Sequence, residues 1–419
     1  MTESNTGEDR RDVVLITIDC WRTDAVSEMP RLRDSADEKG FNRARAVSHS
    51  AATDGAIPPL LASRHSVQAY GRDGQVRKDV RALPGVLREF EYSTAGIIGS
   101  NPFIAKWVRY FDHFWNDGMR VSMDYDSPRY STADRVSRFL RLKQRVNATE
   151  LTARARRWYQ STQSPRFLWM HLMDVHGPYF TGLRGAGQVG LFKTYKTLFD
   201  YHVKNRSTEK IRNRLHALYR QCVRQLDERI TAVLDMVDSD AIVVLTGDHG
   251  EEFDHGMHGH ARLYDECVTT PLFTKNIARP ISHYDVRHID LAPTILAELG
   301  IDKPPSWEGT PVNGTVRESL LSNHAPQLER SYVGLRTDQY KLIKSYHDQH
   351  WTEKNQELYC LDTDPKEQTT VQNTGVTREL ETAIDSFLER NDMGLHVLQE
   401  RSTGIDEEVE ERLTELGYA

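Results

Sequence analysis

The chain has 419 residues, of which 38% are hydrophobic and 27% are charged, and its formal net charge is -7. This composition is ordinary for a globular protein, and the length allows a core that holds a rigid site without disulfide bonds. The acidic balance excludes a globally basic surface of the kind that binds nucleic acid or anionic membranes. No apolar run reaches the length of a membrane-spanning helix.

Residues 1–12 are polar and charged, with no apolar core of a secretory signal. The four cysteines are Cys20, Cys222, Cys267 and Cys360, and they form no C-x-x-C pair. This spacing predicts neither a disulfide framework nor a cysteine-based zinc site. Reduced thiols and the polar start of the chain predict a cytoplasmic location.

Short apolar, β-branched runs alternate with helical stretches along the chain. Continuous apolar runs predict buried strands of a parallel sheet at 13–18, 93–98, 167–170 and 241–246. An apolar stripe at helical spacing predicts a helix over 211–237. This alternation predicts an α/β layered fold.

Two further regions differ from this pattern. Segment 181–209 is polar, basic and poorly periodic, which predicts an insertion or cap. Alternating β-type residues within 331–361 predict a small antiparallel sheet. The predicted divisions are a polar arm at 1–12, a main domain at 13–325, a small sheet subdomain at 326–376 and a charged, solvated helical tail at 377–419.

Polar residues follow several of the predicted strands. Asp19 follows the first strand, Asp248 and His249 follow the strand from 241, His176 comes after the strand from 167, and Asn101 follows the strand from 93. In an open α/β sheet, ligands bind beyond the carboxyl ends of the strands. A carboxylate beside an imidazole suits Mn²⁺, Mg²⁺, Ca²⁺ or Zn²⁺. Taken alone, Asp19 also fits a helix cap, and the Asp-His pair also fits a polar turn.

A histidine-rich loop follows the Asp-His pair, with imidazoles at His255, His258 and His260. We expect His260 to belong to the site and the other two histidines to be structural. An imidazole titrates near neutral pH and can protonate a leaving group.

Thr53 lies in a small-residue loop that is predicted to turn into a helix at Pro58 and Pro59. A hydroxyl before such a helix sits where backbone N–H groups can hold an anion. Thr53 or Asp54 also fits the N-cap of this helix.

The order of these segments resembles the sulfatase family of the alkaline-phosphatase superfamily, over about residues 13–367. The resemblance implies a sulfatase-like layered sandwich with a large mixed, mostly parallel sheet, and a catalytic domain at 13–325 that hydrolyses esters. The segments that carry it are 15–24, 53–64, 167–179, 243–271, 290–294 and 358–365.

The resemblance also implies roles for individual residues. Asp19, Asp248 and His249 stand at metal-ligand positions, and the oxygen of Thr53 completes the shell around one divalent ion. Thr53 stands at the position of the nucleophile.

Three other residues stand at substrate-contact positions of the family. His176 corresponds to a contact with the substrate oxyanion, and Asn101 to another polar contact. His260 falls where sulfatases usually have a lysine that contacts the substrate.

The chain departs from the family pattern at the nucleophile. Sulfatases carry C-x-P-S-R with a Cys or Ser that becomes formylglycine, whereas this chain has Thr53 and, four residues later, Ile57 in place of arginine. Cys20 replaces a second acidic residue. Threonine cannot give the aldehyde, so no formylglycine is expected, and phosphoester or phosphodiester cleavage is favoured.

The expected partner is an anionic ester, a sulfated or phosphorylated glycan or small molecule. One alternative is a sulfuric ester hydrolase that activates Thr53 by another route. A second is a catalytically silent anion- or glycan-binding protein, and transfer to an acceptor hydroxyl stays open.

Overall fold

The computed structural model describes residues 10–118, 132–279, 281, 285–315, 317–347 and 352–391. Most of the predicted N-terminal arm, and the predicted tail beyond residue 391, lie outside the described residues.

An eight-stranded mixed sheet forms the centre of the molecule, with the strand order β4-β3-β5-β1-β6-β7-β2-β8. Strands β4, β3, β5, β1 and β6 run parallel, and β7 is antiparallel to both of its neighbours. The four predicted strands are confirmed as β1, β3, β5 and β6. The strands are β1 Val13–Ile18, β2 Asn42–Val47, β3 Ser93–Ile98, β4 His113–Asn116, β5 Arg166–Leu172, β6 Ile242–Gly247, β7 Thr269–Lys275 and β8 Val286–Arg287.

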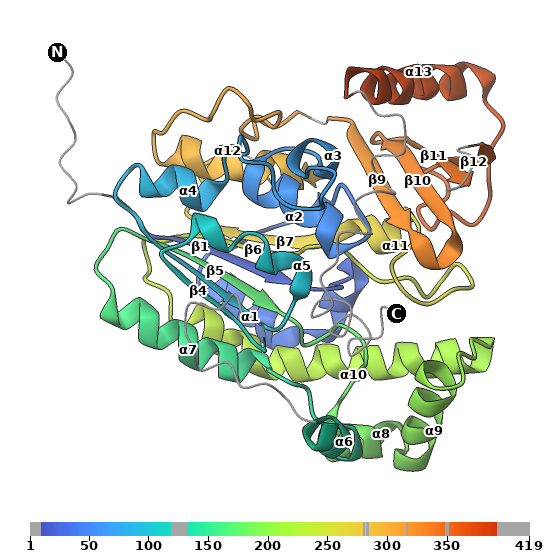
Figure 1. Cartoon of the computed structure of the whole chain (residues 1–419), viewed down its shortest axis with the longest axis horizontal. Helices are drawn as coiled ribbons and strands as arrows, with labels where there is room; N and C mark the ends of the chain where they lie inside the picture. The colour runs from blue at the N-terminus through green and yellow to red at the C-terminus, as the bar shows by residue number, and fades with distance from the viewer. Residues whose placement is uncertain are drawn as a thin grey trace.

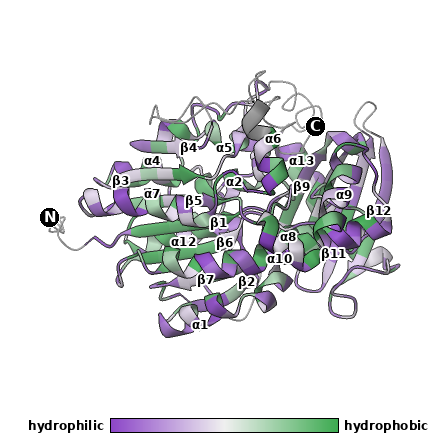
Figure 2. Cartoon of the chain, turned by 90° about the horizontal axis from the view of Figure 1, so that it is seen from below, coloured by the Kyte–Doolittle hydropathy of each residue, from purple (hydrophilic) through white to green (hydrophobic). Residues whose placement is uncertain are grey.

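Helices cover both faces of this sheet because its strands are apolar on both sides (Figures 1 and 2). Along β1, Val14, Ile16 and Ile18 pack toward α1, α7 and α10, whereas Val13 and Leu15 pack toward α2, α4 and α12. The α-helices are α1 Pro30–Glu38, α2 Thr53–Ala62, α3 Ser66–Ala69, α4 Leu83–Arg88, α5 Pro102–Ala105, α6 Thr132–Arg141, α7 Ala148–Ser161, α8 Gly182–Val189, α9 Leu191–His202, α10 Glu209–Leu234, α11 Asp265–Val268, α12 His288–Glu298 and α13 Thr374–Arg390. Short 3-10 turns span Thr23–Glu28, Val108–Tyr110 and Pro326–Leu328.

The predicted small antiparallel sheet is confirmed, with the strand order β12-β11-β10-β9. Its first strand precedes residue 326, where the predicted subdomain begins. Helix α13 packs on this sheet and buries Leu380, Ile384 and Phe387. The prediction of a solvated tail is therefore wrong for α13, whose apolar stripe covers the sheet. The strands are β9 Ser319–Ala325, β10 Arg330–Arg336, β11 Tyr340–His347 and β12 Glu353–Cys360.

Two helical segments differ from their predictions. The predicted helix over 211–237 is α10, which ends at Leu234. The poorly periodic segment 181–209 contains the helices α8 and α9, and Phe192 on α9 is 81% exposed. No helix in the described ranges combines the length and apolarity needed to cross a bilayer.

Candidate active site

The neighbouring strands β1 and β6 bring the predicted metal ligands together. Ile18 pairs with Gly247 at the ends of these strands, so Asp19 and Asp248 leave the sheet side by side. The Nε2 atom of His249 lies 3.6 Å from Asp19 Oδ1 and 3.7 Å from Asp248 Oδ2. All three side chains are 0% exposed. Two buried carboxylates and one imidazole therefore share one small volume.

Helix α2 presents Thr53 to this group. The helix begins at Thr53 itself, and not at Pro58 and Pro59 as predicted. Interior prolines remove backbone N–H donors, and the buried apolar face of α2 compensates for this loss. Thr53 is therefore in the first turn and is not the N-cap residue.

The Thr53 hydroxyl faces the acidic cluster. Its Oγ1 atom lies 3.3 Å from Asp19 Oδ2 and 3.3 Å from His249 Nε2, and the residue is 2% exposed. Asn101 Nδ2 donates to Asp19 Oδ2 at 3.0 Å and lies 3.5 Å from Thr53 Oγ1. The structure therefore brings Thr53 and Asn101 to the same carboxylate.

His171 belongs to the same cluster although it was not among the predicted site residues. Its Nε2 lies 3.3 Å from Asp19 Oδ2, and its Nδ1 lies 2.8 Å from Thr17 Oγ1. The sequence signal for this residue was a single histidine near the end of the apolar strand β5, which pairs with β1.

The carboxylates of this cluster have no Lys or Arg partner among the contacts of the described residues. Asp248 Oδ2 is buried without a hydrogen-bond partner in the described part of the chain. Burial and the charge of Asp19 raise the pKa of Asp248 to about 7. Burial opposes the charge of Asp19 as well, but the imidazoles around it hold its pKa well below the usual range.

A divalent cation fits this donor set. Asp19, His171 and Asp248 each offer an atom within 4.8 Å of the others. The Nδ1 atom of His249 lies 2.8 Å from the carbonyl of Gly250, a contact that leaves Nε2 free of its proton when Nδ1–H donates. Oxygen and imidazole donors without a balancing protein cation are typical of sites for hard or borderline divalent metals.

His260 and His176 lie beside this cluster. The His260 ring centroid is 4.8 Å from that of His249 and 5.8 Å from that of His176. Glu251 Oε1 lies 3.3 Å from His260 Nδ1. Burial opposes the charged imidazole, but the contact with Glu251 raises the pKa of His260 above its ordinary value. Glu251 was not among the predicted site residues.

A chain of contacts connects Glu251 to the segment predicted as a cap. Tyr179 donates to Glu251 Oε2 at 3.1 Å and lies 2.8 Å from His258 Nε2, while His258 Nδ1 lies 2.7 Å from the hydroxyl of Tyr201 on α9. His258 therefore links α9 to the site.

Cys20 occupies the place next to Asp19. Its Sγ lies 3.2 Å from Asp19 Oδ1 and 3.8 Å from His260 Nδ1, and its backbone has a φ of 58°. Burial and the nearby carboxylates raise the pKa of this thiol, so it stays neutral and can donate to Asp19.

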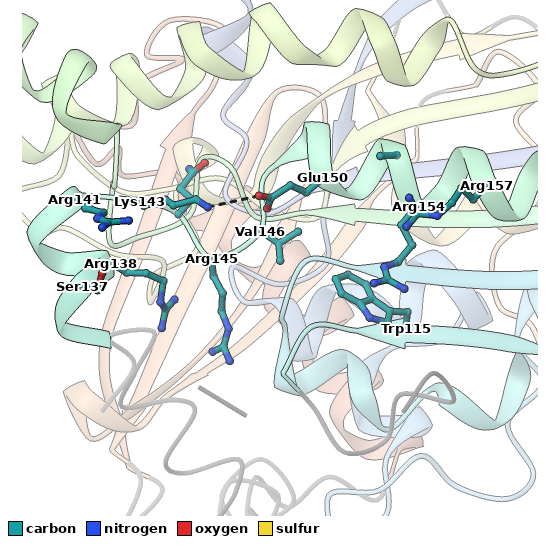
Figure 3. Close-up of a pocket in the computed structure, with 12 residues that line it drawn as sticks. Trp115, Ser137, Arg138, Arg141, Lys143, Arg145, Val146, Glu150, Arg154 and Arg157 are labelled. Atoms are coloured by element: carbon teal, nitrogen blue, oxygen red, sulfur yellow. Dashed lines mark ion pairs between the residues drawn. The ribbon is translucent and has the colours of Figure 1, made fainter. Parts of the chain in front are cut away.

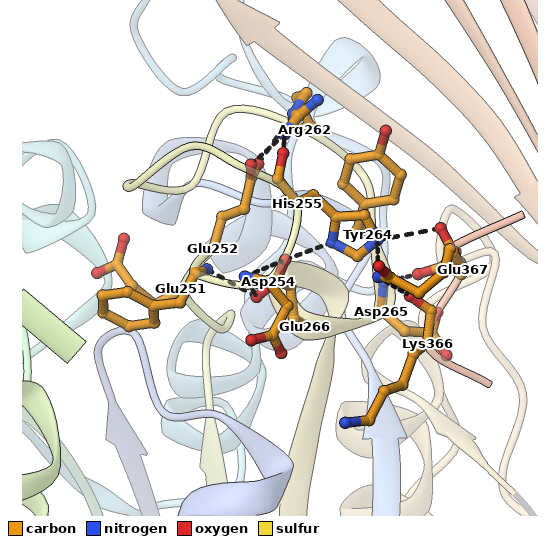
Figure 4. A network of polar contacts seen from close by, with 12 residues as sticks. Glu251, Glu252, Asp254, His255, Arg262, Tyr264, Asp265, Glu266, Lys366 and Glu367 are labelled. Atoms are coloured by element: carbon orange, nitrogen blue, oxygen red, sulfur yellow. Dashed lines mark hydrogen bonds and ion pairs between the residues drawn. The ribbon is translucent and has the colours of Figure 1, made fainter. Parts of the chain in front are cut away.

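Residues 251–266 form a network of polar contacts with one another and with Glu367 (Figure 4). Arg22 contacts Glu266, which also contacts His255. A Cβ atom at Gly250 would lie 2.1 Å from the Glu266 carbonyl oxygen, so only glycine fits this close approach. These contacts hold the loop that carries the site residues.

Comparisons with known proteins agree with this architecture. Residues 11–301 match the family described as sulfatase, and residues 253–393 match the family described as N-sulphoglucosamine sulphohydrolase, C-terminal.

Solved structures with similar folds include BT4656 in complex with its substrate D-glucosamine-2-N,6-O-disulfate. It has 16% sequence identity and a TM-score of 0.70, over 92% of this chain and 98% of that chain. BT1596, a 2-O GAG sulfatase, has 13% identity and a TM-score of 0.67, over 94% and 96%. The phosphonate monoester hydrolase SpPMH from Silicibacter pomeroyi has 16% identity and a TM-score of 0.63, over 91% and 95%. The first family match covers more than half of the chain, which therefore belongs to the sulfatase family of ester hydrolases.

Proposed function

We propose that this sulfatase-family hydrolase cleaves a sulfate or phosphate ester by attack of the unmodified Thr53 hydroxyl, with phosphate esters favoured. The observation that carries the proposal is the position of Thr53 Oγ1, 3.3 Å from both Asp19 Oδ2 and His249 Nε2. A hydroxyl is a weak nucleophile until a neighbouring base or metal lowers its pKa.

Asp19, Asp248 and His249 would hold one divalent cation, with the Thr53 oxygen completing the shell. When bound, such an ion polarises an ester oxygen and lowers the pKa of a coordinated hydroxyl. The donor set suits Mn²⁺, Mg²⁺, Ca²⁺ and Zn²⁺ alike.

Thr53 and the residues around it have separate roles in nucleophilic attack, charge stabilisation and proton transfer. Thr53 releases its hydroxyl proton to solvent and attacks the phosphorus or sulfur atom in line with the leaving oxygen, whose bond to that atom breaks. Asn101 Nδ2, 3.5 Å from Thr53 Oγ1, and His176 stabilise the negative charge on the peripheral oxygens. Protonated His260, supported by Glu251, gives its proton to the leaving oxygen. Water then gives a proton to the now neutral His260 and attacks the same atom, the bond to the Thr53 oxygen breaks, and that oxygen regains a proton.

The choice between esters rests on the nucleophile segment. Thr53 replaces the residue that becomes an aldehyde, and Ile57 replaces the arginine that follows it. SpPMH supports phosphorus chemistry on this fold, because its name describes a phosphonate monoester hydrolase.

Sulfate-ester cleavage is the second candidate function. It is supported by the match of residues 253–393 to the N-sulphoglucosamine sulphohydrolase C-terminal family, and by the sulfated ligand of BT4656.

The test is a hydrolysis assay of the wild-type protein and of Thr53→Ala and Thr53→Ser, each with Mn²⁺, Mg²⁺, Ca²⁺ or Zn²⁺. The substrates are an aryl sulfate, an aryl phosphate monoester and an aryl phosphodiester. We expect phosphoester turnover that falls by at least about 10³-fold in Thr53→Ala and is partly kept in Thr53→Ser. Dominant sulfate turnover would favour the second candidate. Metal binding without turnover of any ester would support a silent binding protein.

A further inference from the structure

The large apolar side chains that remain exposed are concentrated in one region, on α6, on α8, on α9 or directly after α9. These three helices lie together below α10 in Figure 1, and the hydroxyl of Tyr195 on α9 donates to the carbonyl of Leu140 on α6. An exposed apolar region of this kind marks an interaction surface. In the described part of the chain its members are Val136, Leu140, Leu183, Leu191, Phe192, Phe199 and Val203.

The apolar residues of α9 form a stripe along its outer side. Phe199 and Val203 follow Phe192 by seven and eleven residues, a spacing that puts all three on one side of the helix. Phe192 is 81% exposed. The other side of α9 is buried through Thr194 and Leu198. The stripe, which consists of Phe192, Phe199 and Val203, is therefore not part of the core.

Helix α6 shows the same combination of exposed apolar and basic residues. Val136 and Leu140 are one turn apart and exposed. Arg141, the last residue of α6, is exposed as well (Figure 3).

Cations accompany the stripe. Segment 182–214 contains eight Lys or Arg residues and two acidic residues, in a chain whose net charge is -7. Asp200 forms ion pairs with Lys196 and Lys204. The other six cations have no carboxylate of a described residue within ion-pair distance, and they are Arg184, Lys193, Arg206, Lys210, Arg212 and Arg214. Such a local excess of positive charge attracts an anionic partner.

A cleft of about 550 Å³ lies beside α9, where it is bordered by α10. Lys193, Lys210 and Arg214 line this cleft together with one carboxylate, Glu209. A basic pocket next to an apolar surface suits the head group of an anionic lipid.

The combination of apolar and positive surface selects among partners. In a symmetric dimer through this face, the cations of one copy would lie opposite those of the other, and like charges repel. A polar, acidic polypeptide would leave the rings of Phe192 and Phe199 in water. An anionic bilayer supplies both an apolar layer and negative charge, and amphipathic helices with Phe or Leu on one side and flanking Lys or Arg lie in its surface.

The same helix contacts the site from its other side. Tyr201 is nine residues after Phe192, which places it on the opposite side of α9. Its hydroxyl lies 2.7 Å from His258 Nδ1, and His258 Nε2 lies 2.8 Å from the hydroxyl of Tyr179, which donates to Glu251. The thickness of one helix thus separates the stripe from the histidine-rich loop of the site.

We propose that α6, α8 and α9 dock this protein on a lipid bilayer that carries anionic head groups. The stripe enters the apolar layer, and the cations of the cleft contact the head groups. The inference goes beyond the proposed function and does not depend on it, because docking requires neither Thr53 nor a metal.

The test is flotation of the full chain with vesicles over a range of lipid concentrations. The vesicles contain phosphatidylcholine with phosphatidylglycerol, or phosphatidylcholine alone. We expect the wild-type protein to bind the anionic vesicles, and to bind the neutral ones at least about tenfold more weakly. Phe192→Ser/Phe199→Ser and Lys193→Glu/Lys210→Glu should each weaken binding to the anionic vesicles by at least about tenfold. Wild-type protein that binds no vesicles, or variants that bind as the wild type does, would overturn the proposal.

Two matched controls separate the features of this face. Phe192→Leu/Phe199→Leu keeps the stripe apolar and should bind nearly as the wild type does, whereas a loss as large as that of the serine variant would contradict insertion into lipid. Lys354→Glu/Arg378→Glu reverses two exposed cations on the small sheet and α13. Equal loss in this control would mean that net charge governs binding, and would overturn the proposal. Thermal midpoints establish that all variants are folded.

Two further measurements identify the other possible partners. Sedimentation velocity without vesicles that shows a dimer, which Phe192→Ser/Phe199→Ser dissociates, would assign the face to a second copy. Poly-L-glutamate that binds as tightly as the anionic vesicles, at equal charge, would assign it to an acidic polypeptide. Either result would overturn the proposal.

Discussion

Two groups of buried carboxylates differ in how their charge is balanced. Asp265 contacts Arg336 at 2.9 Å and Lys341 at 2.7 Å, both from the small sheet. Asp19 and Asp248 are surrounded by imidazole, amide, hydroxyl and thiol groups, and none of their contacts within the described ranges comes from a Lys or Arg.

This difference separates a structural role from a functional one. A carboxylate paired with cations stabilises a particular packing, here of the small sheet on the segment after the site. Two buried carboxylates without a balancing cation destabilise the protein unless a ligand supplies the charge, and such groups are typical of functional sites. The same 20-residue stretch, 248–267, therefore contains residues of both kinds.

The largest expected effect is a loss of catalysis when one of the two site carboxylates, Asp19 and Asp248, is changed. Asp248→Asn removes a charged metal ligand, and we expect kcat/KM for the preferred aryl ester to fall by at least about 10³-fold. Steady-state kinetics with excess metal measures this, and the exposed Asp362→Asn is the control. A loss below tenfold would mean that Asp248 does not bind the catalytic ion.

The next largest effect is on the stability of the protein when Asp265, the carboxylate paired with cations, is changed. Asp265→Asn removes the buried carboxylate that Arg336 and Lys341 share, although Arg336 keeps Asp285 and Lys341 keeps Glu367. We expect the free energy of unfolding to fall by about 3 kcal/mol. Urea denaturation followed by circular dichroism measures this change. Little or no change would show that the network is dispensable for the fold.

The two groups should also respond differently to pH. The pKa of Asp248 is about 7 in the folded, metal-free protein, above the ordinary value of about 3.9 for an aspartate. Between these values the folded state binds a proton that the unfolded state lacks, so stability falls as pH rises from about 4 to about 7.

Thermal midpoints in a metal chelator measure this loss, which Asp248→Asn should abolish and a divalent cation should reverse. The depressed pKa of Asp265 has the opposite sign: its contribution is present above about pH 4 and is lost on further acidification. A metal-free wild-type protein whose stability is flat between pH 4 and 7 would contradict the account of Asp248.

The smallest effect concerns the proton donor. Glu251→Gln removes the charge that raises the pKa of His260, and we expect a rate loss of about tenfold. Activity requires protonated His260, so the alkaline limb of the pH–rate profile should move to lower pH. A limb that keeps its position would assign the proton transfer to another residue.

Much of the fold could be predicted because β1, β3, β5 and β6 are continuous apolar runs. Strands without such runs escaped prediction: β2 reads Asn-Arg-Ala-Arg-Ala-Val, and it gains its place from pairing with β7 and β8. The start of α2 at Thr53 was not predicted, because Pro58 and Pro59 inside the helix disfavour helical structure locally. The burial of α2 outweighs that local preference. The buried face of α13 was not predicted, because it depends on packing against the small sheet.

The site residues also divide into those that the sequence could predict and those that it could not. Asp19, Asp248 and His249 could be predicted to meet, because they follow strands that run parallel in one sheet. His171 and Glu251 were missed, since their contacts with Asp19 and His260 depend on side-chain direction that strand order does not determine.

The most direct test of the central claim is mass spectrometry of the protein quenched with acid during turnover of its preferred aryl ester. The account predicts that the peptide containing Thr53 gains the mass of one phosphoryl or sulfuryl group, attached to the threonine oxygen. Transfer of that group to any other residue, with Thr53 unmodified throughout turnover, would contradict it.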